Sequence, residues 1–238
     1  MSDRRLPGAD LRAVLRPAIS TESSAQVQAE QLVPGLLRDR PGKLVVDLGC
    51  GRGDSVENFR QADPSVRWVG VEVEGSEFET RPDVELRLFD GVALPFEDAS
   101  VDVIFCKQVL EHVERPQELL ADVGRVLAPG GFFAGSTSHL EPYHGRSTLN
   151  LTPYGLKLLL ERSGLELELV MPGIDGPTLI ARRLLRAPRL FDRFWARRSP
   201  LNALVDGAAR VFGWDAEDRS AFKLAFSGQY AFVARRAA

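Results

Sequence analysis

The feature that most constrains this chain is the segment from Lys43 to Ser55, which reads KLVVDLGCGRGDS. Its β-branched apolar run ending in Asp47 predicts a buried strand, and the three alternating glycines that follow predict a sharp turn into a helix. Glycine allows a left-handed backbone and lets bare N–H groups approach a ligand, and the helix after the turn begins with unpaired donors. The segment therefore predicts a strand–turn–helix unit that binds a polar ligand.

The spacing of the glycines argues against a dinucleotide as that ligand. The dinucleotide fingerprint is G-x-G-x-x-G, and Asp54 occupies the place of its third glycine. An acidic residue at the mouth of the turn suits a ligand that carries a positive charge. A tight turn that binds no ligand is the alternative interpretation.

The rest of the chain alternates strands with helices, which is typical of a parallel α/β sheet. Further strands are predicted at 66–73, 84–89, 132–137, 165–171 and 228–235, together with one that ends at Cys106. Helices are predicted from 21–23 to about 39, at 56–62, between 116 and 129, and at 152–163, and residues 1–20 are expected to be loose. We expect a Rossmann-like, seven-stranded, mainly parallel sheet with an antiparallel last strand and a helical cap inserted between strands six and seven.

Three further motifs lie where the predicted strands begin or end. Glu72 ends the second strand, 25 positions after Asp47, close to where a Rossmann-like unit places a carboxylate for ribose hydroxyls. Asp90-Gly91 follows the third strand, and LPFEDASVDVI (94–104) leads into the fourth. Together with DLGCGRG, these segments resemble the class I S-adenosylmethionine (SAM)-dependent methyltransferases, of the methyltransferase-11-like, small-molecule type that includes sugar and quinone O-methyltransferases.

The resemblance implies an enzyme that uses SAM as its cofactor. Glu72 would bind the ribose hydroxyls, Asp90 would face the adenine amino group, and Gly91 would leave room for the ring. The full set of cofactor-binding residues that we expect is Asp47, Gly49, Gly51, Glu72, Val73, Asp90, Gly91 and Lys107.

The loop after the fifth strand carries two of the three histidines. It runs from Ser138 to Arg146 at the carboxyl edge of the sheet, where α/β folds bind ligands. A neutral histidine can act as a general base near physiological pH, and we favour His144 over His139 because it lies further into the loop, beside Tyr143. A loop histidine without a chemical role is the alternative.

A second candidate group follows the fourth strand. The segment QVLEH (108–112) resembles the Glu-x-x-Glu-His segment with which some quinone O-methyltransferases and RNA terminal-ribose methyltransferases hold a divalent ion, although Gln108 replaces the first Glu. Glu111, His112 and His144 could still bind Mg²⁺ or a transition metal, which would orient and acidify a hydroxyl. In relatives without a metal the same segment only lines the site. The predicted catalytic residues are His144, His139 and Glu111.

The region between strands six and seven is rich in arginine. Residues 179–212 hold eight arginines against two aspartates, a net charge of +6 in a chain whose net charge is −3. Aromatic residues are interleaved with them or follow them, at 191, 194, 195, 212 and 214. This cap could face an acceptor, a phosphate or a membrane surface. An amphipathic cover or a dimer helix with a solvated arginine face explains the same composition.

We expect one methyltransferase domain over 1–238, because a chain of this length with 44% hydrophobic residues can bury one sizeable core. Its expected parts are an N-terminal helical lid (1–40), a SAM-binding core (41–170), a helical cap (171–226) and the last strand (227–238). The acceptor site should lie under the cap and the lid.

Composition and local patterns limit the partners and the compartment. The acidic net charge argues against a general nucleic-acid binder, and Cys106-Lys107-Gln108-Val109 replaces the Pro-Pro and aromatic pattern of DNA exocyclic-nitrogen methyltransferases. We therefore expect no DNA partner and disfavour RNA. The chain shows no long apolar run or signal-peptide pattern, which predicts a cytoplasmic protein. Peripheral membrane contact through the cap and a homodimer stay open.

The sequence best supports a SAM-dependent O-methyltransferase acting on a hydroxyl of a carbohydrate or another small molecule, with or without help from a divalent metal. A sugar hydroxyl is less acidic than a phenol and needs a base or a metal more. The alternatives are a quinone or phenol O-methyltransferase and a non-catalytic SAM-binding scaffold. The carboxylates at strand ends argue against the scaffold, which has no need of them.

Overall fold

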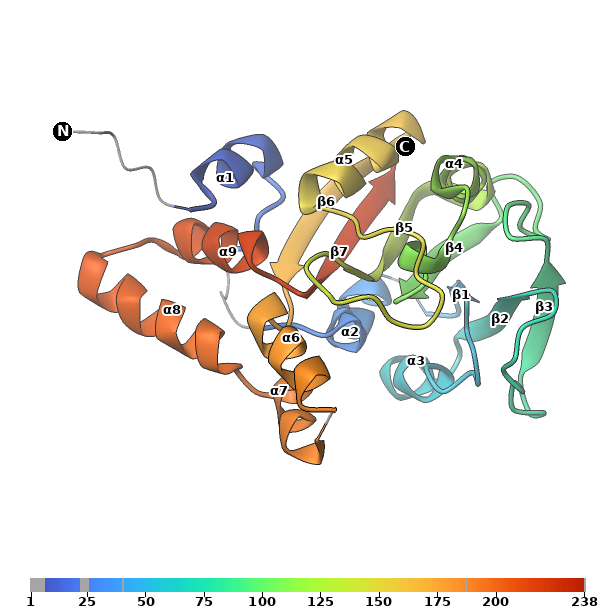
Figure 1. Ribbon diagram of the computed structural model, residues 1–238. Coiled ribbons are helices and arrows are strands. Elements are labelled where there is room, and N and C mark those ends of the chain that lie inside the picture. Colours follow the sequence, from blue (N-terminus) through green and yellow to red (C-terminus); the bar gives the residue numbers. More distant parts are fainter. Residues whose placement is uncertain (1–6, 22–25, 40, 187, 238) are drawn as a thin grey trace.

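The computed structural model describes residues 7–21, 26–39, 41–186 and 188–237. Its centre is a seven-stranded sheet in the order β3-β2-β1-β4-β5-β7-β6 (Figure 1). Strand β7 is antiparallel to both of its neighbours, and the other neighbouring strands of the sheet are parallel to each other. The strands are β1 (Leu44–Leu48), β2 (Arg67–Val73), β3 (Glu85–Phe89), β4 (Val101–Lys107), β5 (Leu127–Ser138), β6 (Leu165–Pro172) and β7 (Gln229–Arg236). The predicted fold class is confirmed.

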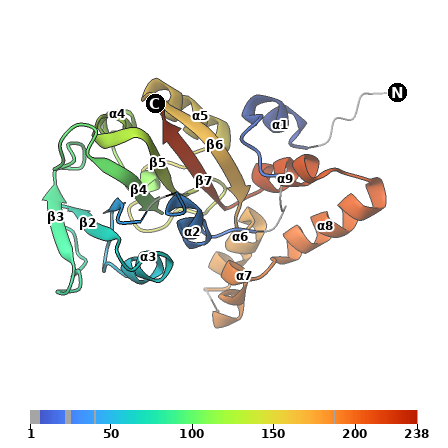
Figure 2. The same ribbon diagram turned by 180° about the vertical axis from the view of Figure 1, so that it is seen from behind.

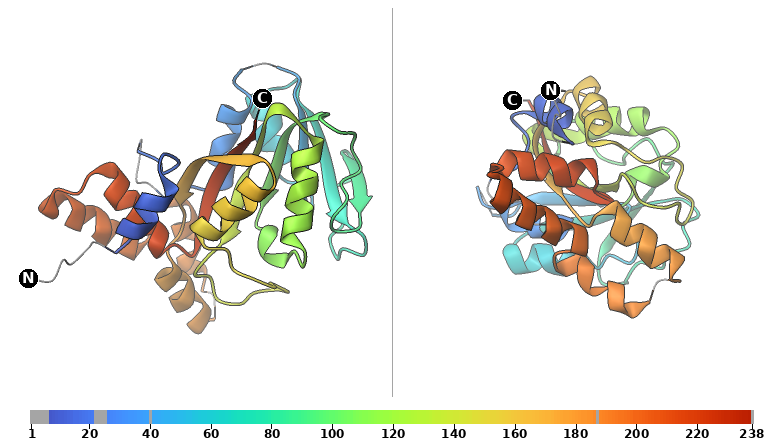
Figure 3. Two further views of the ribbon diagram at one scale, coloured as in Figure 1. Left: turned by 90° about the horizontal axis from the view of Figure 1, so that it is seen from above. Right: turned by 60° about the vertical axis from the view of Figure 1, so that its left-hand side comes forward.

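Helices cover both faces of the sheet (Figures 2 and 3). One face packs against α4 and α5 and the other against α2 and α3, and each interface is an apolar core. Before the cap, the helical elements are α1 (Ala9–Leu15), η1 (Ala29–Leu32), α2 (Val33–Leu36), α3 (Val56–Ala62), η2 (Leu110–His112), α4 (Pro116–Val126) and α5 (Pro153–Arg162). Side chains of Leu119, Val123 and Leu156 are fully buried in the first core, as the helical periodicity predicts.

The expected helical cap lies between β6 and β7. It consists of α6 (Gly176–Leu184), η3 (Arg189–Phe191), α7 (Arg193–Ala196), α8 (Pro200–Phe212) and α9 (Ala216–Ala225). Helices α6 and α9 begin at aspartate caps, because Asp175 accepts from the Thr178 N–H and Asp215 from the Asp218 N–H. Helices α8 and α9 extend beyond the β6 edge of the sheet (Figures 1 and 2). Within the described residues, no helix is both long and apolar enough to span a bilayer.

The N-terminal region differs from the prediction in two ways. Residues 1–20 are not all loose, because α1 forms and buries Leu15 completely. Arg12 of this helix binds the carboxylates of Glu217 and Asp218 in α9, which are distant in sequence and could not be anticipated locally. The single helix predicted up to about residue 39 is instead the short η1–α2 pair, and its predicted start after 21–23 falls in the segment 22–25, outside the described residues.

Strand β5 is longer than predicted. It begins directly after α4 and includes the Pro129-Gly130-Gly131 segment, which we expected only to end the helix. Its register with β4 shifts between the pairs Val101–Leu127 and Val103–Phe132, so the extra residues form an irregularity in the ladder.

Helix α4 closely approaches the end of α5 at Gly124. A Cβ added to Gly124 in α4 would lie 2.4 Å from the backbone oxygen of Ser163, whereas one added to Gly207 in α8 would meet nothing within 4 Å. Gly124→Ala should therefore lower the free energy of unfolding by about 1–3 kcal/mol. The matched Gly207→Ala should leave it unchanged or raise it by up to about 1 kcal/mol, because alanine favours helix. Urea unfolding followed by circular dichroism measures both, and stabilisation by Gly124→Ala would contradict the close packing.

Candidate functional site

Four of the predicted cofactor residues lie along one edge of the sheet. Asp47 is in β1, Glu72 in β2 and Lys107 at the end of β4, and Asp90 directly follows β3. These four strands are neighbours in the sheet and run parallel. All four side chains therefore belong to the carboxyl edge, where open α/β sheets bind ligands.

The turn after β1 has the left-handed backbone that its glycines predict. The φ angle is 69° at Gly49 and 53° at Gly51. A Cβ at Gly49 would lie 2.4 Å from a methyl group of Val109, so the turn needs glycine there. The Gly51 N–H donates a hydrogen bond to the carboxylate of Glu72 (2.8 Å), which ties the turn to the end of β2.

Asp90 and Gly91 form a second tight turn beside Val73. One carboxylate oxygen of Asp90 accepts hydrogen bonds from the N–H groups of Ala93 (2.8 Å) and Val92 (2.9 Å), and these bonds lower the pKa of Asp90. Gly91 has a φ of 91°, and a Cβ there would lie 3.9 Å from the Val73 side chain. The turn therefore presents an ionised carboxylate close to β2.

The carboxyl group of Asp47 is buried beneath the glycine turn. It accepts a hydrogen bond from the Ser55 hydroxyl. Burial raises the pKa of Asp47 to about 7, although the Ser55 bond and the positive charge of Lys107 act in the opposite direction. A cationic ligand that binds beside Asp47 would favour its ionised form and lower this pKa again.

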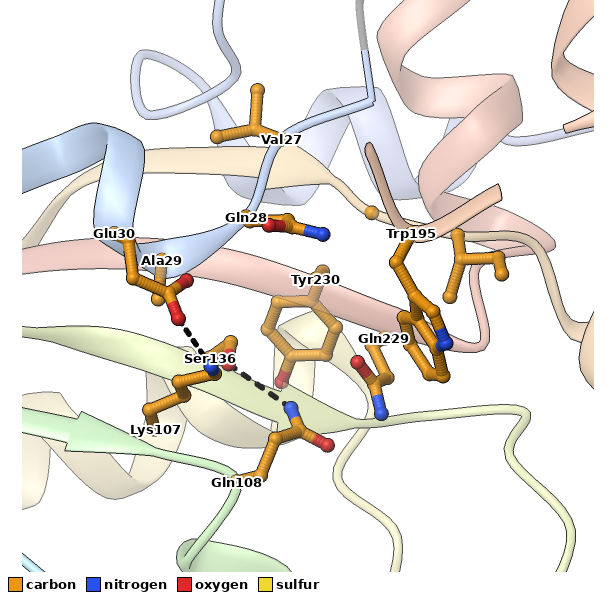
Figure 4. Close-up of a pocket in the computed structure, with 12 residues that line it drawn as sticks. Val27, Gln28, Ala29, Glu30, Lys107, Gln108, Ser136, Trp195, Gln229 and Tyr230 are labelled. Atoms are coloured by element: carbon orange, nitrogen blue, oxygen red, sulfur yellow. Dashed lines mark hydrogen bonds and ion pairs between the residues drawn. The ribbon is translucent and has the colours of Figure 1, made fainter. Parts of the chain in front are cut away.

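A pocket of about 280 Å³ opens beside this edge (Figure 4). Its walls come from the η1 region, the ends of β4 and β5, the connection after β6, helix α7 and the start of β7. The lining residues are Val27, Gln28, Ala29, Glu30, Lys107, Gln108, Ser136, Gly173, Ile174, Trp195, Gln229 and Tyr230.

The lining of this pocket is neutral, polar and aromatic. Its two charged residues, Glu30 and Lys107, form an ion pair with each other. The Trp195 indole supplies flat apolar surface (Figure 4). Three glutamine amides and a serine hydroxyl supply hydrogen-bond donors and acceptors, from Gln28, Gln108, Gln229 and Ser136. This combination suits a neutral ligand with several hydroxyl groups.

The three residues predicted to bind a metal lie together. One candidate ligand atom from each of Glu111, His112 and His144 lies within 4.8 Å of the other two. The two imidazole rings meet edge to face with centroids 5.3 Å apart. Glu111 is fully buried, burial raises its pKa, and its carboxylate lies 4.0 Å from Nε2 of His144.

A second carboxylate, Glu141, joins this cluster. The Ser138 hydroxyl lies 3.0 Å from Oε1 of Glu111 and 2.7 Å from Oε2 of Glu141, so one proton donor serves two carboxylates. Nδ1 of His144 lies 3.8 Å from Glu141, and its Nε2 lies 4.0 Å from Glu111. Each ring nitrogen of His144 therefore lies near a carboxylate.

Hydrogen bonds connect the cluster to the pocket. The amide of Gln229 donates to Glu141 (2.7 Å), and the amide oxygen of Gln108 lies 3.3 Å from the Ser138 hydroxyl. Gln108 also donates to the Ser136 hydroxyl (3.0 Å) (Figure 4). Gln108 and Gln229 therefore touch both the pocket and the cluster, so the two form one continuous polar site.

His139 lies apart from this cluster. Its ring hydrogen-bonds to the backbone of Ala225 in α9, and burial lowers its pKa. Its backbone N–H donates to the Gly228 carbonyl (2.7 Å). The structure therefore brings His144, and not His139, to Glu111 and His112.

Sequence reasoning missed Glu141, Ser138 and Gln229. Glu141 and Ser138 belong to the loop that was singled out for its histidines, and their polar side chains at the end of a strand were an available signal. No signal in the sequence pointed to Gln229, because its role depends on the pairing of β7 with β5. This pairing sets Gln229 opposite Ser138.

Comparisons with known proteins point to a methyltransferase domain. Residues 46–135 match the family model described as "Methyltransferase domain". A protein of Mycolicibacterium smegmatis named "Probable S-adenosylmethionine-dependent methyltransferase" is 29% identical over 184 residues, which cover 64% of this chain and 70% of that protein. An uncharacterized methyltransferase of Mycobacterium avium is 38% identical over 120 residues, which cover 48% of this chain and 46% of that one.

The solved structures are similar in fold. A geranyl diphosphate methyltransferase in complex with SAM superposes with a TM-score of 0.56 at 22% identity, over 87% of this chain and 84% of that chain.

The chain spans less than half of the length of several curated relatives that it matches. The fold and the matched domain together place the chain in the class I SAM-dependent methyltransferases, as the sequence motifs indicated.

The buried carboxyl of Asp47 predicts how stability depends on pH. Its pKa is about 7 in the folded protein against 3.8 for the free side chain, so folding favours the protonated form. This contribution to stability is complete below pH about 4 and is lost as the pH rises through about 7. Asp47→Asn, which cannot ionise, should therefore be more stable than the parent at pH 8, by about 2–4 kcal/mol.

Urea unfolding of both proteins at a series of pH values, without SAM, measures this difference. Asp54→Asn is the matched control, because it removes an exposed carboxylate from the same turn. An equal difference between Asp47→Asn and the parent at pH 5 and pH 8 would refute the raised pKa.

Proposed function

We propose that this protein transfers the methyl group of SAM to a hydroxyl oxygen of a carbohydrate or a similar neutral, polyhydroxylated small molecule. The bond from carbon to the sulfonium sulfur breaks as the bond from carbon to oxygen forms, the hydroxyl proton passes to a base, and S-adenosylhomocysteine leaves. The observation that carries the proposal is the Glu111–His112–His144 cluster, joined by hydrogen bonds to a neutral pocket rich in amides.

The cofactor would occupy the edge formed by β1 to β4. In this proposal Glu72 binds the ribose hydroxyls, Asp90 and Gly91 accommodate the adenine, and Asp47 faces the positively charged end of the cofactor. Val73, Gly49, Gly51 and Lys107 complete the expected contacts. The two turns beside Glu72 and Asp90, and the position of Asp47 below the first of them, support this assignment.

The acceptor would occupy the pocket under Trp195. An aromatic side chain provides a face against which a sugar ring can stack, and the amides of Gln28, Gln108 and Gln229 match hydroxyl groups, which both donate and accept. The pocket's only two charged lining residues, Glu30 and Lys107, are paired, which disfavours an anionic acceptor. We further propose that residues 1–40 and 171–226 act as lid and cap, since Val27 to Glu30 and Trp195 line the pocket.

His144 is the proposed base. Glu111 on one side and Glu141 on the other hold a proton on its imidazole once the acceptor hydroxyl has released it. Much of the rate would come from holding the acceptor oxygen in line with the methyl group. His139 is a weaker candidate, because its ring is engaged with α9.

The same cluster fits a divalent ion. Glu111, His112 and His144 would hold it, and two imidazoles with one carboxylate suit a transition metal better than Mg²⁺, which prefers oxygen ligands. A bound ion would lower the pKa of the acceptor hydroxyl. Ser138 and Glu141 would orient the ligands from outside.

A quinone or phenol O-methyltransferase is the second candidate, because Trp195 would also stack on an aromatic acceptor. A phenol ionises without much help from a base. Turnover of phenols with little dependence on His144 would favour this candidate over the carbohydrate. SAM binding without turnover of any acceptor would favour a scaffold.

The first test of the proposal is methyl transfer from labelled SAM to mono- and oligosaccharides, quinols and phenols. Turnover of a saccharide should fall by a factor of about 100 or more in His144→Ala, because a positioned base contributes at least that much. SAM binding, measured by calorimetry, should not change. His139→Ala is the matched control and should keep most of the activity. The activity measured after EDTA treatment, and again after addition of Mn²⁺, Zn²⁺ or Mg²⁺, distinguishes metal-assisted from metal-free transfer.

The second test concerns the acceptor pocket. Trp195→Ala should raise KM for the acceptor about tenfold or more while leaving KM for SAM unchanged, because only the stacking surface is lost. Trp214→Ala is the matched control, since Trp214 stacks on Phe212 outside the pocket. Equal effects of the two substitutions would place the acceptor elsewhere.

A further inference from the structure

Helix α8 buries two polar side chains alongside Val205 and Ala209 and leaves several apolar side chains exposed. Its buried side includes Asn202 and Asp206, which are 1% and 5% exposed. Leu204, Val211 and Phe212 are 72%, 79% and 71% exposed. A helix on the surface of a soluble domain normally buries its apolar face, so an exposed apolar face of this kind marks an interaction surface.

Specific contacts of the two buried polar side chains fix this orientation of α8. The Asn202 amide donates to the carbonyl of Gly173 and to the side chain of Gln26, both at 3.1 Å. The Asp206 carboxylate lies 2.6 Å from the ammonium group of Lys223 in α9. These buried polar contacts orient α8 so that Leu204 points away from the protein.

The outer face of α8 is a continuous apolar strip. Leu204, Gly207 and Val211 are three, four and seven positions apart, which places them on one side of the helix. All three are exposed, and α8 lies at the outside of the molecule (Figure 3). With 13 residues the helix is about 20 Å long.

Uncompensated positive charge accompanies this strip. The cap contains exposed arginines that make no ion pair with any described residue, namely Arg183, Arg186, Arg189, Arg197 and Arg210. Asp192 and Asp206 are already engaged, because Asp192 binds Arg182 (3.2 Å) and Asp206 binds Lys223 and Arg198. The cap therefore combines exposed apolar side chains on α8 with exposed arginines.

We propose that the outer face of α8, together with the arginines beside it, binds the surface of an anionic lipid bilayer. An interfacial helix buries its apolar face at the boundary between headgroups and acyl chains, and flanking arginines attract anionic headgroups. A second copy of the chain is the competing occupant. Two copies packed through α8 would bring Arg197 and Arg210 of each close to those of the other, without free carboxylates to neutralise them.

The proposal also relates the bilayer to the pocket. Trp195 lines the pocket from α7, and Arg193 and Arg197 lie two positions before and after it in the chain. A bilayer bound by this cap would lie near the pocket, where it could present an acceptor attached to a lipid. Membrane binding itself does not depend on the proposed methyl transfer.

Vesicle sedimentation tests the proposal with the full chain. The parent should bind phosphatidylcholine vesicles that contain phosphatidylglycerol, should not bind pure phosphatidylcholine vesicles, and should lose binding in high salt. The double variant Arg197→Gln/Arg210→Gln should lower the partition coefficient roughly 25-fold, since each basic residue contributes a factor of about five. Leu204→Gln/Val211→Gln should lower it by a factor of about ten or more. Both pairs are exposed, so circular dichroism should show unchanged folding.

Leu88→Gln is the matched control, because Leu88 is an exposed leucine in β3, at the opposite edge of the sheet. It should bind like the parent. Absence of binding to phosphatidylglycerol vesicles at low salt, or equal binding by both double variants and the parent, would overturn the proposal. Sedimentation equilibrium supplies the remaining outcome: a dimer that Leu204→Gln/Val211→Gln dissociates would show that a second copy occupies this face instead.

Discussion

The antiparallel pairing of β7 with β5 is the interaction on which the candidate site depends. It sets Gln229 opposite Ser138 and Tyr230 opposite Thr137, so residues near the end of the chain line a site that begins near residue 108. The pairing continues into the loop after β5, where the N–H groups of His139 and Leu140 donate to Gly228 and Ser227. The loop that carries Glu141 and His144 is thereby anchored at its start.

Two buried carboxyl groups make the site favourable for positively charged groups. Asp47 and Glu111 are both buried, and burial raises the pKa of each. Buried carboxyl groups of this kind are costly for an empty site and become favourable when a cation arrives. A sulfonium cofactor at Asp47 and a protonated imidazole or a metal ion at Glu111 would each provide that charge. The pocket joined to the Glu111 cluster stays neutral because Glu30 and Lys107 compensate each other.

The features that could be predicted from the sequence are those that short segments of the chain determine. The glycine turn and the carboxylates at strand ends follow from short segments, and the structure places them along one edge. Glu111, His112 and His144 could be grouped because the segments after β4 and β5 must meet at that edge. Helix α1 could not be predicted, since it is short, lacks a side-chain cap and depends on Arg12 binding α9. The burial of Asp206 in α8 was equally hidden, because its partner Lys223 is in another helix.

The way the cap is attached to the sheet affects how the sequences of such chains can diverge in evolution. Pro172, at the end of β6, pairs with Tyr230 in β7, and the Gly173 N–H donates to the Gln229 carbonyl (2.9 Å). The segment between them leaves the sheet and returns to it at a single point, so its length and sequence can change without shifting the register of any strand. It nevertheless supplies Trp195 to the pocket. A fold with this connection can exchange one segment and acquire a new acceptor while the cofactor half stays as it is.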